Sequence, residues 1–360
     1  MTGGELVIGE ELLPVSVLTG FLGSGKTTVL GRLLRQPEMA RVAVIINEFG
    51  EIGLDHLLVE STDEDLVLLK NGCLCCSVRS DLVRALRSLY VRRAAGETTP
   101  FDRIVIETSG LADPVSIIQS LIRDPLLADC YRLDGVIVTV DAALGALTLD
   151  RQTEAVRQVA VADRLLLTKS DLATSESLAA LTARLRRINP AAPILPVAHG
   201  NVSATTLLNL GFYNSATKSV DVRRWLDVEA YGADEHRHED HGHEGHGDHG
   251  HIHGDARRHD DHIRSFCIVY ERPLAWRKLT CALQALINAH GADILRVKGV
   301  VNIEGRAAPV VIHGVQHLFH PPVLLERWPD ADRRSRLVFI TRDVEHGVVA
   351  DALAGIHTAD

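Results

Sequence analysis

Residues 20–27 read Gly-Phe-Leu-Gly-Ser-Gly-Lys-Thr and match the spacing G-x-x-x-x-G-K-[ST]. Glycines in such a loop let backbone N–H groups turn inward around a phosphate, and the N-terminus of a following helix adds partial positive charge. Lys26 then reaches the β- and γ-phosphates, and the Thr27 hydroxyl ligates Mg²⁺. The motif lies between an apolar run at 15–19 and a helical pattern at 27–35, as it requires. The segment therefore predicts a nucleotide site.

A second nucleotide-binding element is expected at 168–171, Thr-Lys-Ser-Asp, directly after the apolar run 165–167. The carboxylate of Asp171 can accept two hydrogen bonds from the N1–H and N2–H₂ groups of guanine, which adenine lacks. This position predicts a preference for GTP over ATP. The alternative is a plain helix start that Asp171 caps; the position after a late strand of the same domain favours the guanine role.

Glu107-Thr108-Ser109-Gly110 follows a third apolar run, at 103–106. A carboxylate at a strand end that faces the phosphate loop can hold Mg²⁺ or its water, and the N–H of Gly110 can touch a γ-phosphate and so sense hydrolysis. The alternative is a helix entry in which Asp113 or Ser109 caps a helix that begins near Pro114. Both roles can hold together.

Cys73-Leu74-Cys75-Cys76 brings three thiols into four residues, after the turn pair Asn-Gly at 71–72. Thiolates at this spacing can converge on one ion, and they favour Zn²⁺ or Cu(I), with Co²⁺ also feasible. A redox pair and a set of small buried apolar residues are the alternatives. Zinc normally takes four ligands, so the fourth must come from elsewhere or stay open for metal transfer.

The segment 47–55, Asn-Glu-Phe-Gly-Glu-Ile-Gly-Leu-Asp, follows the second expected strand, where a P-loop GTPase keeps a nucleotide-sensing loop. Its acidic residues can meet Mg²⁺ or give an oxygen ligand to the cysteine-bound metal, and Glu48 is the candidate for this role. The alternative is an acidic surface loop.

Histidine is concentrated in one segment: ten of the 18 histidines lie between His236 and His262, among Gly, Asp and Glu. Imidazoles on a chain of this composition can bind several divalent ions weakly and exchangeably, which suits gathering or buffering of metal. The candidate auxiliary ligands are His241, His243, His246, His249, His251 and His253. The alternative is a solvated spacer. His313, His317 and His320 also have ligand-like spacing, but surface or core roles are favoured for them.

The elements that must position these residues divide the chain into two domains. Upstream of 221, short runs rich in Val, Ile and Leu alternate with helical patterns, which predicts an α/β fold, a P-loop domain with a mostly parallel sheet covered on both faces. The expected domains are 1–220 for this unit, 221–262 for an acidic, His-rich, flexible linker, and 263–360 for a smaller α+β unit. Ligand chemistry is expected at the carboxyl ends of the parallel strands.

Composition excludes several classes. The net charge is -9, of which the linker, with 12 acids against 5 bases, supplies -7, so the chain has no basic footprint for nucleic acid. Apolar stretches fall short of the eighteen or so residues that span a bilayer, and the first residues do not resemble a signal peptide. Six cysteines are too few for a disulfide scaffold. We expect a cytoplasmic protein.

Taken in order, the segments GFLGSGKTT, NEFGEIGLD, CLCC, ETSGLADP, TKSD, the His-rich linker and LRVKG at 295–299 resemble the CobW-type family of P-loop GTPases over roughly 14–345. The resemblance implies a GTPase that binds a transition metal at C-x-C-C and couples its release to hydrolysis. It implies Mg²⁺ ligation by Thr27 and Glu107, and metal ligation by Cys73, Cys75 and Cys76. The nucleotide-binding residues that it implies are Gly20, Gly23, Ser24, Gly25, Lys26, Thr27, Thr28, Gly110, Lys169 and Asp171.

The function that the resemblance implies is a GTP-hydrolysing metallochaperone that carries zinc to a client metalloprotein. Cobalt delivery to corrin synthesis, activation of a metal-dependent hydratase, and a non-enzymatic zinc buffer are the alternatives. Lys26, Thr27 and Glu107 are the catalytic candidates, and turnover should be slow without a partner or a second subunit, because no arginine finger is evident; a homodimer is one such arrangement. One residue departs from the family pattern: Thr168 stands where Asn is usual, so the carboxamide that would contact guanine and brace the P-loop is missing. We expect the guanine preference to survive through Asp171, in a weakened form.

Overall fold

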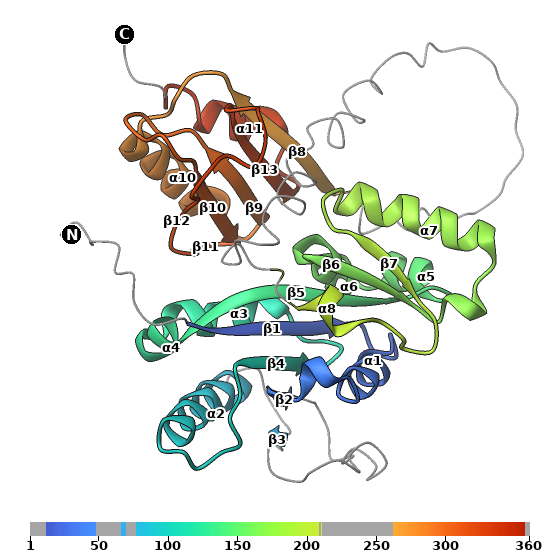
Figure 1. The fold of residues 1–360 in the computed structure, drawn as a ribbon. Helices are drawn as coiled ribbons and strands as arrows, with labels where there is room; N and C mark the ends of the chain where they lie inside the picture. The colour runs from blue at the N-terminus through green and yellow to red at the C-terminus, as the bar shows by residue number, and fades with distance from the viewer. Residues whose placement is uncertain (1–11, 48–65, 70–76, 209, 211–261, 357–360) are drawn as a thin grey trace, which may run out of the picture.

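The structure is a computed structural model that describes residues 12–47, 66–69, 77–208, 210 and 262–356. Its first part is built on a seven-stranded parallel sheet with the strand order β3-β2-β4-β1-β5-β6-β7 (Figure 1). The strands are β1 (Leu13–Gly20), β2 (Val42–Asn47), β3 (Leu66–Leu69), β4 (Arg103–Thr108), β5 (Tyr131–Asp141), β6 (Arg164–Thr168) and β7 (Ile194–Val197).

Helices cover both faces of this sheet. One face packs against α2 (Ser77–Ala94), α3 (Pro114–Arg123), α4 (Pro125–Cys130), α5 (Gly145–Arg151), α6 (Thr153–Val161) and α7 (Ser175–Ile188). The other face packs against α1 (Lys26–Leu33) and α8 (Ala204–Leu207), and short 3₁₀ turns occur at η1 (Pro37–Met39) and η2 (Ser170–Leu172).

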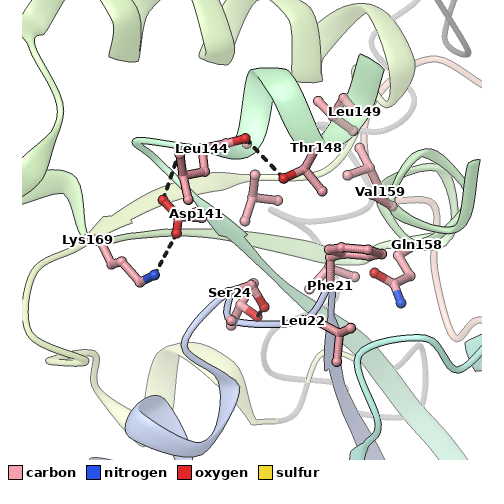
Figure 2. A pocket seen from close by; sticks show the side chains of 16 residues that line it. Phe21, Leu22, Ser24, Asp141, Leu144, Thr148, Leu149, Gln158, Val159 and Lys169 are labelled. Carbon is pink, nitrogen blue, oxygen red and sulfur yellow. Dashed lines mark hydrogen bonds and ion pairs between the residues drawn. The ribbon is translucent and has the colours of Figure 1, made fainter. Parts of the chain in front are cut away.

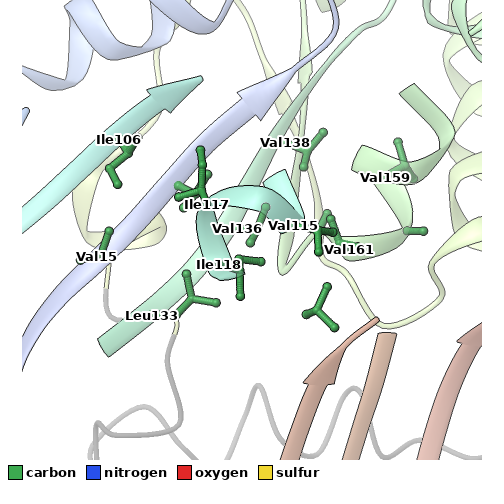
Figure 3. Close-up of a cluster of buried hydrophobic side chains, with 14 of the residues drawn as sticks. Val15, Ile106, Val115, Ile117, Ile118, Leu133, Val136, Val138, Val159 and Val161 are labelled. Atoms are coloured by element: carbon green, nitrogen blue, oxygen red, sulfur yellow. The ribbon is translucent and has the colours of Figure 1, made fainter. Parts of the chain in front are cut away.

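Neighbouring residues of one strand serve the two opposite cores, because side chains alternate across a sheet. Val15 and Val17 of β1 belong to the core under α2, α3 and α6, while Leu18 belongs to the core under α1. Figure 3 shows part of the first core, where Ile117 and Ile118 of α3 meet Val15 and other strand side chains. Burial on both faces explains why these strands read as nearly continuous apolar runs.

The second part is a six-stranded antiparallel sheet with two helices. Its strands are β8 (Ile263–Tyr270), β9 (Ile294–Val301), β10 (Val310–Val315), β11 (Leu318–Phe319), β12 (Val323–Leu324) and β13 (Ser335–Arg342), and its helices are α10 (Trp276–His290) and α11 (His346–Ala352). Both helices pack on one face of the sheet, where Phe339 is completely buried. This gives the α+β unit that the sequence predicts.

The two parts share buried surface. Leu295, Val315 and Ile340 of the second sheet belong to the same apolar cluster as the core of the first part. Beside them, Arg296 and Lys298 of β9 reach Asp163, which lies between α6 and β6 and whose side chain is only 10% exposed. Lys298 Nζ lies 2.8 Å from Asp163 Oδ1. An apolar contact and a buried ionic cluster thus join the two sheets.

The alternation of strands and helices expected upstream of the linker is present, and all seven strands of the observed sheet run parallel. Four short helices, α4, α5, α8 and α11, were not expected from the sequence. In the expected linker, residues 221–261 lie outside the described residues. Among the described helices, none combines the length and the apolar character that crossing a bilayer needs.

Candidate functional site

The phosphate loop turns tightly between β1 and α1. Gly20, Gly23 and Gly25 have φ values of 142°, 71° and 88°, which L-residues with side chains rarely adopt. A Cβ on Gly20 would lie 2.2 Å from Thr139 Oγ1, so only glycine fits there. Lys26 is buried at 8% exposure, and its Nζ donates to the carbonyls of Gly20 at 2.8 Å and Phe21 at 3.1 Å. The Lys26 side chain therefore lies against the phosphate loop and is held by its backbone carbonyls.

Thr27 and Glu107 meet at the mouth of this loop. Glu107 lies near the carboxyl end of β4, in register with Leu18 of the neighbouring β1, and Thr27 is the second residue of α1. Thr27 Oγ1 donates to Glu107 Oε1 at 2.7 Å, and Glu107 is only 4% exposed. Both groups line a cavity of about 330 Å³ together with Lys26 and Gly110. A hydroxyl and a carboxylate are hard oxygen ligands, so the pair fits Mg²⁺.

Gly110 touches the phosphate loop directly. A Cβ on this residue would lie 2.5 Å from the backbone N of Leu22 and 2.7 Å from its Cα, so any side chain would push the two loops apart. Gln158, on α6 and 1% exposed, donates from Nε2 to the carbonyls of Gly110 at 3.2 Å and Ala112 at 3.1 Å. This brace was not expected from the sequence, because a glutamine inside a helix carries no local signal of its partner.

The strand-end segment also starts a helix. Asp113 Oδ1 accepts a hydrogen bond from Val115 N at 2.9 Å, so it caps α3 as the alternative interpretation proposed. Burial raises the pKa of Asp113, although the bond from Val115 N opposes that rise. The carboxylate near the end of β4 and the cap of α3 are therefore different residues, Glu107 and Asp113.

Thr168 braces the phosphate loop. Its hydroxyl donates to the carbonyl of Ser24 at 2.6 Å and lies 3.2 Å from that of Val140. The carboxamide of the family pattern is absent, as the sequence indicates, but a hydroxyl at the end of β6 reaches the loop backbone in its place. Ser24 is held from the other side as well, because its hydroxyl lies 2.6 Å from that of Thr139.

Lys169 and Asp171 follow on the turn after β6. Lys169 has a left-handed backbone with φ 54°, and its Nζ donates to Asp141 Oδ2 at 2.6 Å. Asp171 does not cap a helix; its side chain is 31% exposed and its Oδ2 lies 3.9 Å from His199 Nδ1. The sequence did not single out Asp141 or His199, although Asp141 ends a strand at the same sheet edge as Glu107.

A second cavity, of about 290 Å³, also borders the phosphate loop, at Phe21, Leu22 and Ser24 (Figure 2). Leu144 and Val159 form apolar parts of its wall, and Asp141 and Gln158 line it as polar groups. Lys169 lines both this cavity and the one that contains Thr27 and Glu107. The turn after β6 thus contributes to both cavities.

The metal candidates lie mainly outside the described residues: Cys73, Cys75, Cys76, Glu48, His241, His243, His246, His249, His251 and His253. Of the three C-terminal candidates, His313 and His320 stack with ring centroids 4.7 Å apart, while His317 is exposed and separate. Within the described part of the chain, no group of three or more His, Cys, Asp or Glu residues is arranged to hold a metal ion.

Comparison with known protein families covers both parts of the chain. Residues 14–196 match the nucleotide-binding domain described as CobW/HypB/UreG. Residues 263–357 match the C-terminal domain of the cobalamin synthesis protein cobW.

Relatives match over nearly the full length. The zinc chaperone YjiA of Escherichia coli is 32% identical over 96% of this chain and 98% of its own. The zinc chaperone CobW of Pseudomonas aeruginosa is 33% identical over 95% of this chain and 90% of its own. The crystal structure of Zn(II)-bound YjiA GTPase from E. coli superposes with a TM-score of 0.67 at 29% identity, covering 97% of this chain and all of that one. The chain therefore belongs to the CobW/HypB/UreG family, with a CobW-type C-terminal domain.

Proposed function

We propose that this protein is a GTP-hydrolysing zinc chaperone, which binds zinc at its C-x-C-C segment and delivers it to a client metalloprotein. The observation that carries the proposal is the convergence of Thr27 and Glu107 at 2.7 Å beside Lys26, in a phosphate loop of intact geometry. Two relatives that match over nearly the whole chain are named zinc chaperones, and one of them is called a GTPase in its zinc-bound structure.

In this proposal, different residues of the site bind the metal ion, the phosphates and the base. Thr27 and Glu107 would hold Mg²⁺, which neutralises charge on the β- and γ-phosphates when bound. Lys26 exchanges its two carbonyl partners for phosphate oxygens, which keeps its ammonium paired throughout. Gly110 presents its backbone beside Leu22, so that it reports the state of the γ-phosphate. Asp171 selects guanine by the hydrogen bonds that it accepts.

Zinc is the cargo in this proposal, and Cys73, Cys75 and Cys76 are its ligands. The segment joins the carboxyl end of β3 to the start of α2, and the phosphate loop follows the carboxyl end of β1 in the same parallel sheet. GTP binding therefore acts at the sheet edge from which the cysteine segment departs, and hydrolysis loosens the metal. Glu48 is the candidate oxygen ligand, and the histidine tract gathers metal for transfer.

Turnover is slow in the isolated protein, since the described residues include no arginine aimed into the cavity at Thr27 and Glu107. A client or a second copy of the chain supplies the missing group. We place the protein in the cytoplasm, because a reducing compartment keeps clustered thiols available to bind metal.

The first test compares phosphate release from GTP and from ATP, with and without Zn²⁺. We expect hydrolysis of GTP over ATP, and a loss of about 100-fold in Thr27→Ala, which removes a group that would hold Mg²⁺ at the developing charge. Thr27→Ser keeps the hydroxyl and should retain most activity. No turnover under any condition would contradict the proposal and favour a zinc buffer.

The second test addresses the metal. Cys75→Ser combined with Cys76→Ser should abolish tight zinc binding in a chelator competition. Cys281→Ser is the matched control, because Cys281 is an exposed free cysteine on α10. Unchanged affinity in the double variant would overturn the assignment of the site.

A further inference from the structure

Asp141, the last residue of β5, uses its two carboxylate oxygens differently. Oδ1 accepts hydrogen bonds from the backbone N–H groups of Ala143 at 2.9 Å and Leu144 at 3.0 Å. Oδ2 accepts from Lys169 Nζ at 2.6 Å (Figure 2). The two backbone hydrogen bonds to Oδ1 thus fix the orientation of the carboxylate. Oδ2 is held in place to accept from Lys169.

Lys169 is the partner that needs such an anchor. Its long stem has many rotamers, and its backbone adopts the left-handed conformation at φ 54° and ψ 31°, which is unfavourable for a residue with a side chain. The side chain is 38% exposed, so packing alone does not hold it. The bond to Asp141 therefore selects one path for the stem, along the boundary between the two cavities.

The electrostatics of the pair favour the charged form. Burial on its own would raise the pKa of Asp141, but the Lys169 ammonium and the N–H groups of Leu144 and Ala143 outweigh it, and the pKa lies below its ordinary value. The Asp141 side chain is only 10% exposed and is already oriented, unlike the partners of a typical surface ion pair. The two residues therefore form a preorganised unit.

Asp141 is also the register partner of Thr168 on the adjacent β6. Thr168 braces the phosphate loop through Ser24, but a hydroxyl cannot orient the base-reading turn as an amide side chain would. We propose that Asp141 is the positioning residue for guanine nucleotide binding, because it holds Lys169 in the conformation in which the base is bound. This role rests on the proposed GTP-dependent function.

The test is a double-mutant cycle on the full-length protein, with the dissociation constant of a fluorescent GDP as the readout. Asp141→Asn keeps an acceptor for the turn but removes the charge that faces Lys169. We expect about tenfold weaker binding, which is about 1.4 kcal/mol. Lys169→Met should weaken binding by at least as much, and the double variant should be no weaker than Lys169→Met alone.

A kinetic readout separates positioning from a structural role. In Asp141→Asn the KM for GTP should rise about tenfold, while kcat at saturation stays within about twofold, because Asp141 does not line the cavity that contains Thr27 and Glu107. Lys169→Arg, which keeps the charge, should bind GDP within about threefold of the wild type and tests the pair without altering Asp141.

Asp102→Asn is the matched control. It breaks an exposed ion pair with Arg41, next to the amino ends of β2 and β4, and should leave GDP binding unchanged. Unchanged affinity in Asp141→Asn, or effects that multiply in the double variant, would overturn this role for Asp141. A wild-type protein that does not prefer GDP to ADP would instead overturn the proposed function, so the two failures are distinguishable.

Discussion

The Thr168 hydroxyl contacts the phosphate loop at a position where the family pattern has the longer side chain of Asn. Its hydroxyl is buried and donates to the carbonyl of Ser24 at 2.6 Å, within 3.2 Å of that of Val140. Removing a buried donor leaves carbonyl groups without the partner that replaced water. The hydroxyl therefore stabilises both the end of β6 and the loop that binds phosphate.

Thr168→Val keeps the shape of the side chain and removes this donor. We expect a loss of about 1–3 kcal/mol in the free energy of unfolding in urea, and weaker GDP binding with it. Thr168→Ser keeps the hydroxyl and should retain most of both. A valine variant as stable as the wild type would show that the hydroxyl does not brace the loop.

At the scale of elements, the longer strands were predictable from the sequence, whereas the short helices and the shortest strands were not. Because both faces are buried, central strands contain nearly continuous apolar runs, such as Ile104–Ile106 in β4, and these runs identify the strands in the sequence. The helices α4 and α5 have six and seven residues, too few to display a helical period. The two-residue strands β11 and β12 carry no pattern at all.

The candidate site also contains residues that the sequence predicted and residues that it did not. Lys26, Thr27 and Glu107 were predictable, because the motif spacing and the strand end each carry their own signal. The partners of the loops were not: Gln158 reaches Gly110 from the middle of α6, 48 residues along the chain. Such contacts depend on how helices pack on the sheet, which local sequence does not specify.

Gly110→Ala tests the close approach of two loops. The new Cβ would meet the backbone of Leu22 at 2.5 Å, and a backbone neighbour cannot yield as a flexible side chain does. We expect GTP hydrolysis to fall at least about tenfold, a cost of about 1.4 kcal/mol in the barrier, while GDP binding changes little because the γ-phosphate is absent. Gly347→Ala is the control, since its Cβ would meet nothing within 4 Å. Equal hydrolysis in both variants would contradict the proposed contact.

At the scale of the whole molecule, Asp163 links the two parts. It accepts bonds from Arg296 and Lys298 of the second sheet and from Val136 N of its own. Burial opposes the charge of Asp163, but the two cations outweigh it and hold the pKa well below its ordinary range. The cluster therefore fixes how the C-terminal sheet sits on the nucleotide-binding part.

Asp163→Ala should be strongly destabilising, by about 3–5 kcal/mol, because it leaves two buried cations without their counter-ion. Urea unfolding measures this loss, and an early transition of the C-terminal part should appear in limited proteolysis. Asp351→Ala, at an exposed position of α11, is the control. A small effect in Asp163→Ala would mean that the apolar contact alone holds the parts together.

The same interface predicts a pH dependence. Burial lowers the pKa of His313 well below its ordinary value, and it lowers the pKa of His320 to about 4. The charge of Arg296 also lowers both pKa values, whereas the charge of Asp163 raises them. The unfolded chain protonates its histidines near pH 6.5 and therefore binds more protons between pH 6.5 and 4. Stability should thus fall as the pH falls through this window, by about 2–3 kcal/mol for His320 alone.

Urea unfolding of metal-free protein at pH 7.5 and 4.5 measures this loss. His320→Leu should show a shallower dependence, since Nε2 of His320 is buried without a hydrogen-bond partner among the described residues and an apolar side chain can replace it. If the free energy of unfolding of His320→Leu changed with pH as steeply as that of the wild type, the pH dependence would come from groups other than His320. Protonation of Asp163 would reduce the stability further only below this pH window, because the pKa of Asp163 is lowered.

Coupling between the nucleotide and the metal is the central claim, and the most direct measurement is the zinc affinity of the whole protein in its two nucleotide states. Chelator competition with Mg²⁺ and a non-hydrolysable GTP analogue is compared with the same titration in GDP. We predict tighter zinc binding in the triphosphate state, by about 5- to 150-fold, the range of a coupling free energy of 1–3 kcal/mol. Equal affinities in the two states would contradict a chaperone that uses GTP hydrolysis to release its metal.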